Sequence, residues 1–219
     1  MNVTEEQKRF NMIEQQIRTW GVLDPIILEL LTKIHREKYV PLPYRGLAFA
    51  DISIPIYHGE TMLAPRQEAK ILQALNLNKN HIVLHVGTGS GYFVALLAAL
   101  SKSVITMDIY EDLILRAKQI HIDNNIKNID YLHDDGVLGY AEKAPYDVIV
   151  LTGAVAQESI GLRKQLSIGG KLFLFEGVAP IMSAKLIHKV GSNEYKTEYL
   201  FEDVIPSLYL NRQPSSFIF

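Results

Sequence analysis

A glycine-rich turn between two apolar runs places the strongest constraint on how this chain can fold. Residues 86–93 read Val-Gly-Thr-Gly-Ser-Gly-Tyr-Phe, with three glycines in five positions. The run before the turn, residues 81–86, has the length of a strand, and the run after it, residues 92–100, has the length of a helix. Glycine removes side chains from a turn, so a ligand or another part of the chain can approach the backbone closely. The sequence therefore predicts a strand, a tight turn and a helix, with either a binding site or a close packing contact at the turn.

The alternation of strands and helices continues along the chain. We expect strands at residues 103–108, 129–132, 146–151 and 171–175, and a helix at residues 111–124. Residues 182–190 and 197–204 look like two further strands, joined by a Gly-Ser-Asn turn. The predicted fold class is therefore α/β, a Rossmann-like, doubly wound and mostly parallel sheet with an antiparallel C-terminal strand pair and an N-terminal helical extension.

The N-terminal extension is expected to cover residues 1–64. Thr4 and Gln7 make a capping box for a first helix, which Gly21 ends. Prolines and a glycine break any long element between residues 39 and 65. We predict that residues 1–64 contribute helices and a loop covering the substrate and the cofactor, packed on a main domain of residues 65–219, so that the whole is one compact unit.

Composition limits the compartment and the partners. The 219 residues include no cysteine, which excludes disulfides and thiolate metal sites, and we expect no metal site of another kind. The formal net charge of -2 gives no electrostatic footprint for nucleic acid or an anionic membrane. No apolar stretch reaches the roughly 20 residues of a membrane helix, and the first ten residues are polar where a signal peptide would be basic and then apolar. We expect a cytoplasmic protein with neither a nucleic-acid nor a membrane partner.

The spacing of the glycines favours a nucleoside without phosphates as the ligand. A dinucleotide fingerprint needs a glycine where this chain has Tyr92, and no Gly-Lys-Ser/Thr sequence follows, which excludes a P-loop. Asp108 ends the second predicted strand, where its carboxylate can accept hydrogen bonds from both ribose hydroxyls. S-adenosylmethionine is the common cofactor of this kind, and its carboxylate could use free backbone N–H groups of the turn. The carboxylates of Asp134 and Asp135 follow the third strand, where one can accept from the adenine amine.

Five motifs in order resemble those of the protein-L-isoaspartate O-methyltransferase family. The resemblance extends from the N-terminal helices to about residue 204. It rests on these segments: Gly59-Glu60-Thr61 with Pro65, Gly87-Thr88-Gly89-Ser90-Gly91-Tyr92, Asp134-Asp135-Gly136, residues 144–150, and Gln165-Leu166 with Gly169-Gly170. The resemblance implies a methyltransferase that moves methyl from S-adenosylmethionine to the α-carboxylate of isoaspartyl residues, the first step in repairing damaged proteins.

The resemblance also implies which residues bind the cofactor. They are Met62, Gly87, Thr88, Gly89, Gly91, Asp108, Ile109, Asp134 and Asp135, and we expect Ser90 and His85 to join them. Thr61 and Met62 are expected to lie over the cofactor, and Thr61 is the expected catalytic residue. His85 takes the place of the acid that usually precedes the glycine turn, and its neutral ring could accept a hydrogen bond from the cofactor's amino group.

Leu63 marks a departure from the family pattern. The resemblance places the family's active-site serine at this position, and leucine cannot donate a hydrogen bond. A carboxylate with a pKa of about 4 is already ionised at neutral pH, so its methylation requires no general base, and alignment and desolvation carry most of the rate. We expect Glu60, Leu63 and Arg66 to shape the substrate pocket, with Arg66 suited to binding a carboxylate.

The residues leave three functions open. The first is an isoaspartate-type O-methyltransferase, the second a methyltransferase with another peptide or small-molecule acceptor, and the third a non-catalytic protein that binds S-adenosylmethionine. The expected partner is a peptide, protein or small-molecule carboxylate. The sequence decides neither the oligomeric state nor the role of the tail, residues 210–219.

Overall fold

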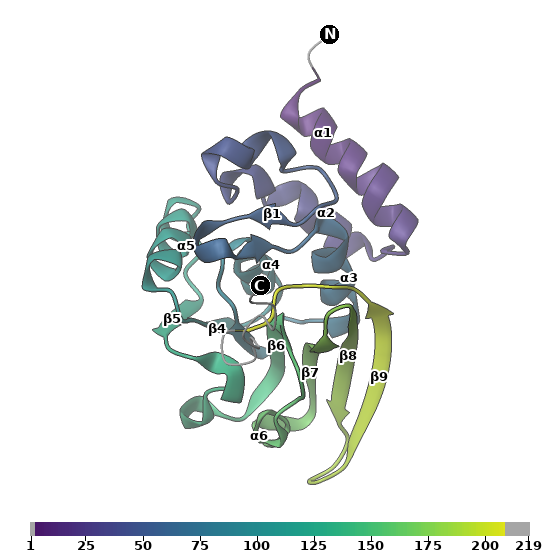
Figure 1. The fold of residues 1–219 in the computed structure, drawn as a ribbon, viewed down its shortest axis with the longest axis vertical. Helices are drawn as coiled ribbons and strands as arrows, with labels where there is room; N and C mark the ends of the chain where they lie inside the picture. Colours follow the sequence, from purple (N-terminus) through teal and green to yellow (C-terminus); the bar gives the residue numbers. More distant parts are fainter. Residues whose placement is uncertain (1–2, 209–219) are drawn as a thin grey trace, which may run out of the picture.

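A seven-stranded sheet forms the centre of the molecule (Figure 1). The structure is a computed structural model that describes residues 3–208, so the tail at residues 210–219 lies outside the described residues. The strand order is β5-β4-β3-β6-β7-β8-β9. The strands are β3 (Ile82–Val86), β4 (Ser103–Asp108), β5 (Ile129–His133), β6 (Tyr146–Val155), β7 (Leu166–Val178), β8 (Ile181–Lys189) and β9 (Tyr195–Glu202). Neighbours from β5 to β7 are parallel, whereas β8 and β9 are antiparallel, which confirms the predicted fold class.

Helices cover both faces of this sheet. The described helices are α1 (Glu5–Met12), α2 (Pro25–Lys33), α3 (Pro65–Leu75), α4 (Tyr92–Leu100), α5 (Glu111–Asp123) and α6 (Ile160–Lys164). Of these, α1 lies outermost, away from the sheet (Figure 1). Shorter helical turns occupy Ile13–Ile17, Arg18–Trp20, Arg36–Lys38, Leu42–Leu47, Tyr57–Gly59, Gly136–Leu138 and Ala141–Lys143. The strand-to-helix connections run from β3 to α4 and from β4 to α5, as the alternating pattern predicts. No pattern in the sequence indicates α6, which has five residues.

The N-terminal helices follow the capping signals in the sequence. The side chain of Thr4 accepts a hydrogen bond from the amide of Gln7 at 3.2 Å and starts α1. The helix then passes through a π-helical turn and a 3-10 turn, and it ends at Gly21, whose φ is +81°. Along the chain, a two-stranded hairpin follows these helices and precedes α3. It pairs β1 (Ile54–Pro55) with β2 (Thr61–Met62).

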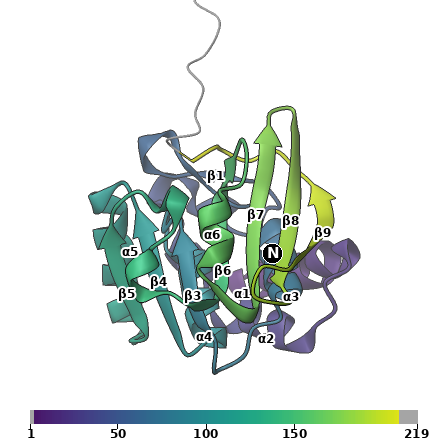
Figure 2. The ribbon, with the colours of Figure 1, turned by 90° about the horizontal axis from the view of Figure 1, so that it is seen from below.

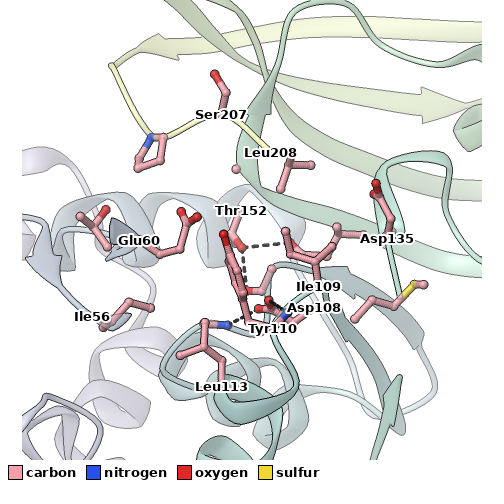
Figure 3. A pocket seen from close by; sticks show the side chains of 18 of the residues that line it. Ile56, Glu60, Asp108, Ile109, Tyr110, Leu113, Asp135, Thr152, Ser207 and Leu208 are labelled. Carbon is pink, nitrogen blue, oxygen red and sulfur yellow. Dashed lines mark hydrogen bonds between the residues drawn. The ribbon is translucent and has the colours of Figure 1, made fainter. Parts of the chain in front are cut away.

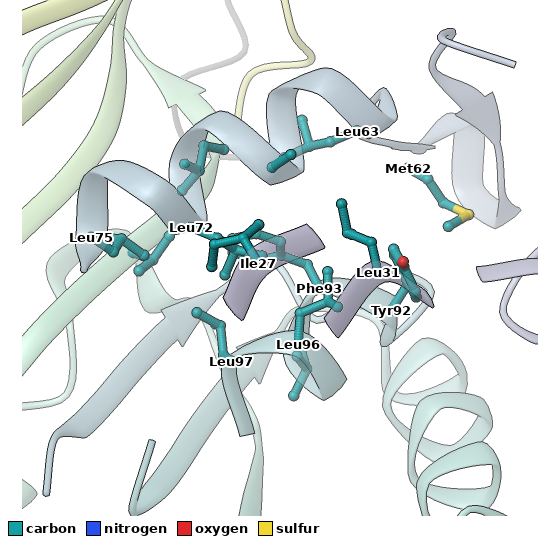
Figure 4. Close-up of a cluster of buried hydrophobic side chains, with 14 of the residues drawn as sticks. Ile27, Leu31, Met62, Leu63, Leu72, Leu75, Tyr92, Phe93, Leu96 and Leu97 are labelled. Carbon is teal, nitrogen blue, oxygen red and sulfur yellow. The ribbon is translucent and has the colours of Figure 1, made fainter. Parts of the chain in front are cut away.

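Alternate residues of the central strands face two separate hydrophobic cores. Val83, Val104 and Val148 point to one face and belong to the larger core. Figure 4 shows part of this core, where Leu31 of α2, Leu72 of α3 and Phe93 of α4 meet. Leu84 and Ile105 point to the other face, which α6 and residues 137–144 cover. The period-two pattern of the strands therefore fixes their register between two helical layers (Figure 2).

The chain returns from β9 to the middle of the sheet. Residues 203–208, here called the strap, cross from the end of β9 to the carboxyl end of β6, in yellow in Figure 1. The amide of Ala154 donates to the carbonyl of Pro206 at 2.9 Å, and the amide of Leu208 donates to the carbonyl of Ala154 at 2.8 Å. Ser207 thereby forms an isolated parallel bridge to β6. The last described residues therefore lie beside the carboxyl ends of the central strands.

Candidate active site

A pocket opens at the carboxyl ends of β3, β4 and β6 (Figure 3). Parallel α/β sheets bind ligands at this edge, where the strand order reverses, here between β3 and β6. The lining residues come from the hairpin, the strand ends and the strap: Ile56, Glu60, Thr61, Val86, Gly87, Gly89, Met107, Asp108, Ile109, Tyr110, Leu113, Asp134, Asp135, Gly136, Thr152, Gly153, Pro206, Ser207 and Leu208. Segments far apart in the sequence thus form one cavity.

The glycine turn brings the backbone of β3 to the floor of the pocket. At Gly87, with φ of +99°, a Cβ atom would lie 2.8 Å from the hydroxyl oxygen of Thr152. At Gly91, with φ of +84°, a Cβ atom would lie 2.7 Å from the Cβ of Ala117 on α5. Both positions combine a left-handed backbone with a close approach, so both require glycine. The turn therefore serves close packing at Gly91, while Gly87 and Gly89 also line the pocket.

Most amides of the turn are engaged within the chain. Those of Gly87 and Thr88 donate to the carbonyl of Met107 at 2.9 and 3.1 Å, and that of Gly91 donates to the carbonyl of Thr88 at 2.9 Å. The amide of Gly89 donates to Asp108 Oδ2 at 2.9 Å. The expectation that the turn offers free N–H groups to a ligand is therefore wrong for these four residues, because the local fold uses them.

Asp108 lies at the end of β4 with its carboxylate at the pocket. Besides Gly89, the amide of Tyr110 donates to it, reaching Oδ1 at 3.0 Å. Burial raises the pKa of Asp108, and the hydrogen bonds from Gly89 and Tyr110 oppose this effect. Each carboxylate oxygen can accept more than one hydrogen bond, so both oxygens keep acceptor capacity for a diol.

The charged groups of the lining are all acidic. They are Glu60, Asp108, Asp134 and Asp135, and the described lining includes no lysine, arginine or histidine. A phosphorylated nucleotide would meet repulsion in such a pocket, whereas a nucleoside that carries a sulfonium and an ammonium would be attracted. The carboxylate acceptors and the close backbone of the glycine turn therefore fit S-adenosylmethionine.

His85 lies under the floor of the pocket, fully buried, in a chain of threonine hydroxyls. Thr152 Oγ1 donates to the carbonyl of Val86 or Gly87, at 3.1 and 3.2 Å, so it accepts from His85 Nε2 at 3.1 Å. His85 Nδ1 then accepts from Thr106 Oγ1 at 2.9 Å. Burial lowers the pKa of His85 to about 3, so the ring is neutral. The expected contact with the cofactor's amino group is not available, because both ring nitrogens are paired, and His85 reaches the pocket only through Thr152.

The residues of the hairpin divide between the pocket and the core. Glu60 and Thr61 line the pocket, as expected of substrate-binding and catalytic candidates. Met62 and Leu63 are buried, 4% and 6% exposed, and pack in the larger core with Leu31 and Tyr92 of the helices below (Figure 4). The backbone carbonyl of Leu63 accepts from Arg36 Nη2 at 2.7 Å.

The other predicted residues lie around the turn and at the rim. Ile109, Asp134 and Asp135 line the pocket, and Asp135 Oδ1 also accepts from the amide of Val137 at 2.9 Å. Thr88 is buried and its hydroxyl contacts that of Thr106 at 2.8 Å. Ser90 Oγ accepts from the amide of Tyr92 at 3.3 Å. Thr88 and Ser90 thus have local structural partners.

Arg66 does not have the arrangement expected of a substrate-binding arginine. Its Nη1 lies 3.2 Å from Asp51 Oδ2 and its Nη2 lies 3.0 Å from Asp203 Oδ2. The guanidinium also lies over the ring of Trp20, 5.4 Å from the centroid. Both arms of the guanidinium pair with carboxylates of the chain, so binding of the substrate's carboxylate by Arg66 stays a prediction that would require one of these ion pairs to open.

Several lining residues were not among the predicted site residues. Tyr110 follows Asp108 by two positions, and its ring stacks on that of His58 with centroids 4.1 Å apart. Thr152 directly follows the predicted fourth strand, and its place at the carboxyl edge of the sheet already favours a ligand site there. Pro206 and Leu208 reach the pocket because the strap crosses the sheet. The only signal in the sequence is that residues 205–208 loosely match the substrate-contacting Val-Pro-Leu segment that the family resemblance implies.

Among residues 3–208, no cluster of three histidine, aspartate or glutamate side chains is arranged to hold a metal ion. In the same part of the chain, no helix combines the length and the apolar character needed to cross a membrane.

Comparison with known proteins points to one family. The model of the Protein-L-isoaspartate(D-aspartate) O-methyltransferase family (PCMT) matches residues 7–203. The chain is 32% identical over 197 residues to Protein-L-isoaspartate O-methyltransferase 2 of Pelobacter propionicus, covering 90% of this chain and 88% of that protein. It is 33% identical over 194 residues to Protein-L-isoaspartate O-methyltransferase 1 of Geotalea uraniireducens, covering 88% and 89%.

Solved structures share the fold. A Plasmodium falciparum beta-aspartate methyltransferase (PCMT), solved in complex with S-adenosyl-L-homocysteine, superposes with a TM-score of 0.77 at 21% identity, covering 92% of this chain and 98% of that one. A protein-L-isoaspartate O-methyltransferase structure gives the same TM-score at 24% identity, covering 91% and 65%. At these identities, the likeness concerns the fold.

Proposed function

The chain belongs to the Protein-L-isoaspartate(D-aspartate) O-methyltransferase family, and we propose that it transfers a methyl group from S-adenosylmethionine to the α-carboxylate of isoaspartyl residues in proteins. One observation supports this most directly. Asp108 presents its carboxylate beside the glycine turn, in a pocket whose charged groups are all acidic. This arrangement suits a cationic nucleoside and disfavours a phosphorylated one.

Cofactor binding is proposed to use the floor of the pocket. Asp108 would accept from the ribose hydroxyls, and Asp134 or Asp135 from the adenine amine. Gly87 and Gly89 would allow close approach, since a side chain at Gly87 would displace Thr152. When bound, S-adenosylmethionine supplies a methyl group activated by the adjoining sulfonium. The chain's own contribution is to orient the two reactants and to exclude water.

The acceptor is proposed to lie against the hairpin and the strap. An α-carboxylate is ionised at neutral pH, so the reaction needs no side chain to remove a proton. Thr61 lines the pocket and carries a hydroxyl that can orient the acceptor, while Glu60 beside it shapes the entrance. Leu63 packs in the core and its side chain has no hydrogen-bonding group, so we propose that Thr61 performs the orientation without a hydroxyl at position 63.

We make two further proposals, one about the compartment in which the protein works and one about the organisation of its chain. We propose that the protein works in the cytoplasm, which the absence of cysteine supports. We also propose that residues 1–64 and 65–219 act as one unit, which is supported by the larger core, because that core includes Ile17 and Leu31 together with Leu72 and Val148.

The test is transfer of labelled methyl to an isoaspartyl peptide and to its aspartyl twin. We expect the unaltered protein to methylate only the isoaspartyl peptide, and the Leu63→Ser variant to retain that preference. An Asp108→Asn variant should lose both cofactor affinity and transfer. Binding of S-adenosylhomocysteine without transfer to either peptide, by both the unaltered protein and Leu63→Ser, would overturn the isoaspartyl proposal and direct the search to other acceptors.

A further inference from the structure

The strap forms one wall of the pocket and is attached at two places. Its C-terminal end is hydrogen-bonded to Ala154 of β6, and a Cβ on Gly153 would lie 2.6 Å from the side chain of Leu208. Its N-terminal end is Asp203, which lies beside the start of α3. In Figure 3, Ser207 and Leu208 lie across the pocket from Asp108 and Leu113. The strap therefore forms the wall opposite the proposed nucleoside contacts.

Asp203 accepts hydrogen bonds from two side chains of α3. Its Oδ2 accepts from Arg66 Nη2 at 3.0 Å and from Gln67 Nε2 at 2.7 Å. Its Oδ1 accepts from the amide of Val204 at 2.9 Å, which fixes the direction in which the strap leaves β9. Gln67 is only 2% exposed. Charge-assisted bonds of this kind, at a partly buried carboxylate, are among the stronger polar contacts in proteins.

The same two side chains of α3 also hold the segment that carries Thr61. Gln67 Oε1 accepts from the amide of Ala64 at 2.7 Å, directly after the hairpin. Arg66 is bound by Asp51 on the other side of the hairpin, through its amide at 3.0 Å and its Nη1 at 3.2 Å. Asp203 is thus linked, through Arg66 and Gln67, to the chain on both sides of the hairpin.

We propose that Asp203, Arg66 and Gln67 form a latch that fixes the strap against the hairpin and thereby positions the methyl acceptor. Asp203 and Arg66 are positioning residues, since they act through Pro206, Ser207 and Leu208 on one side and through Thr61 on the other. The part that concerns the acceptor rests on the proposed function. The part that concerns the strap depends only on the contacts of the latch.

The first experiment measures the strap directly. Hydrogen exchange at the amides of Ala154 and Leu208 reports the two bonds that attach the strap to β6. In Asp203→Asn and in Arg66→Met, we expect both amides to exchange about ten-fold faster, because the N-terminal attachment is weakened. Arg163→Met is the matched control, because Arg163 on α6 is 31% exposed against 25% for Arg66 and pairs with Glu158, which precedes that helix. This control variant should leave the exchange rates of both amides unchanged.

The second experiment measures the acceptor. With an isoaspartyl peptide, we expect both latch variants to raise KM about ten-fold, while the Kd for S-adenosylhomocysteine stays within about two-fold. Arg66→Lys should recover part of the loss, since an ammonium can replace one of the two ion pairs. Unchanged amide exchange in both variants would overturn the latch. Faster exchange with an unchanged KM would overturn the positioning role. If the unaltered protein transfers no methyl to this peptide, the proposed function fails, and the exchange data still decide whether the latch exists.

Discussion

Acidification should destabilise this protein through one buried side chain, His85. Its ring is fully buried and both nitrogens contact threonine hydroxyls, Nδ1 at Thr106 and Nε2 at Thr152. A second proton would sit on Nδ1, which now accepts a hydrogen bond. Burial away from water lowers the pKa of His85 to about 3.

The sign and size of the effect follow from linkage. In the unfolded chain, the histidine has a pKa of about 6.5, so below that pH the unfolded state binds a proton that the native state does not bind. A depressed native pKa therefore contributes stability that is present above about pH 6.5 and is lost as the pH falls toward about 3. Each pH unit in that window removes about 1.4 kcal/mol, so the loss between pH 7.5 and pH 5 is about 2 kcal/mol.

Urea unfolding at pH 7.5 and at pH 5 measures this loss. Other groups also titrate, so the informative quantity is the difference between the unaltered protein and His85→Asn, which has no titrating group there. We expect the variant to be less stable at both pH values and to lose about 2 kcal/mol less between them. His188→Gln, on β8 and away from the pocket, is the control and should behave as the unaltered protein.

Equal losses in the unaltered protein and in His85→Asn would refute the reasoning. Nitrogen NMR of the His85 ring in the unaltered protein gives an independent check if the variant does not fold. The expected signal at pH 5 is a neutral ring with its proton on Nε2. A doubly protonated ring at that pH would equally contradict the assignment.

Three further substitutions test the need for glycine at position 91, the role of Asp108 in binding the cofactor, and the buried ion pair between Arg36 and Glu68. Gly91→Ala should cost about 2–4 kcal/mol in urea unfolding, since the new methyl would clash with α5, whereas Gly21→Ala, with similar φ and open space, should cost about 1 kcal/mol. Asp108→Asn should weaken S-adenosylhomocysteine binding about ten-fold or more in calorimetry, because a charged acceptor is lost. Arg36→Met should cost about 3 kcal/mol by leaving Glu68 buried without its cation, and adding Glu68→Gln should restore part of that loss.

Comparable costs for the two glycine variants would contradict the clash at Gly91. Unchanged affinity in Asp108→Asn would remove Asp108 from the cofactor site. A double variant no more stable than Arg36→Met would mean that the arginine stabilises through packing and its bond to the Leu63 carbonyl, and not through its charge.

The sheet was predictable because its signals are local. A strand, a glycine turn and a helix are read from adjacent residues. The positions of the later strands along the chain follow from their apolar runs. The two elements whose presence or start was not predicted, α6 and the first part of β7, lack such local signals. Helix α6 is five residues long and contains Gly161, so it shows no periodicity. Strand β7 begins at Leu166, earlier than the expected residue 171, because it pairs with Tyr146 beyond an irregularity in register.

The site was predictable where the strand ends themselves supply it. Asp108 and Asp135 follow apolar strands, and the topology brings them to one edge. The ion pair of Arg66 was not predictable because its partner Asp203 is 137 positions away, and a sequence shows a charge but not what neutralises it. The partners of His85 were not predictable for a related reason: its threonine partners come from β4 and β6, and only the folded sheet sets them beside the ring.

The place of the strap in the chain has a consequence for how the protein is made. Synthesis delivers the N-terminal part first, so the glycine turn, Asp108 and Asp135 are available well before Asp203. The bonds of Asp203 to Arg66 and Gln67 span 137 and 136 positions, and contacts between such distant residues form only after most of the chain exists. A growing chain can therefore assemble the acidic floor that suits a nucleoside while the facing wall is still untranslated. We expect the ability to bind the cofactor to arise before the ability to hold a methyl acceptor.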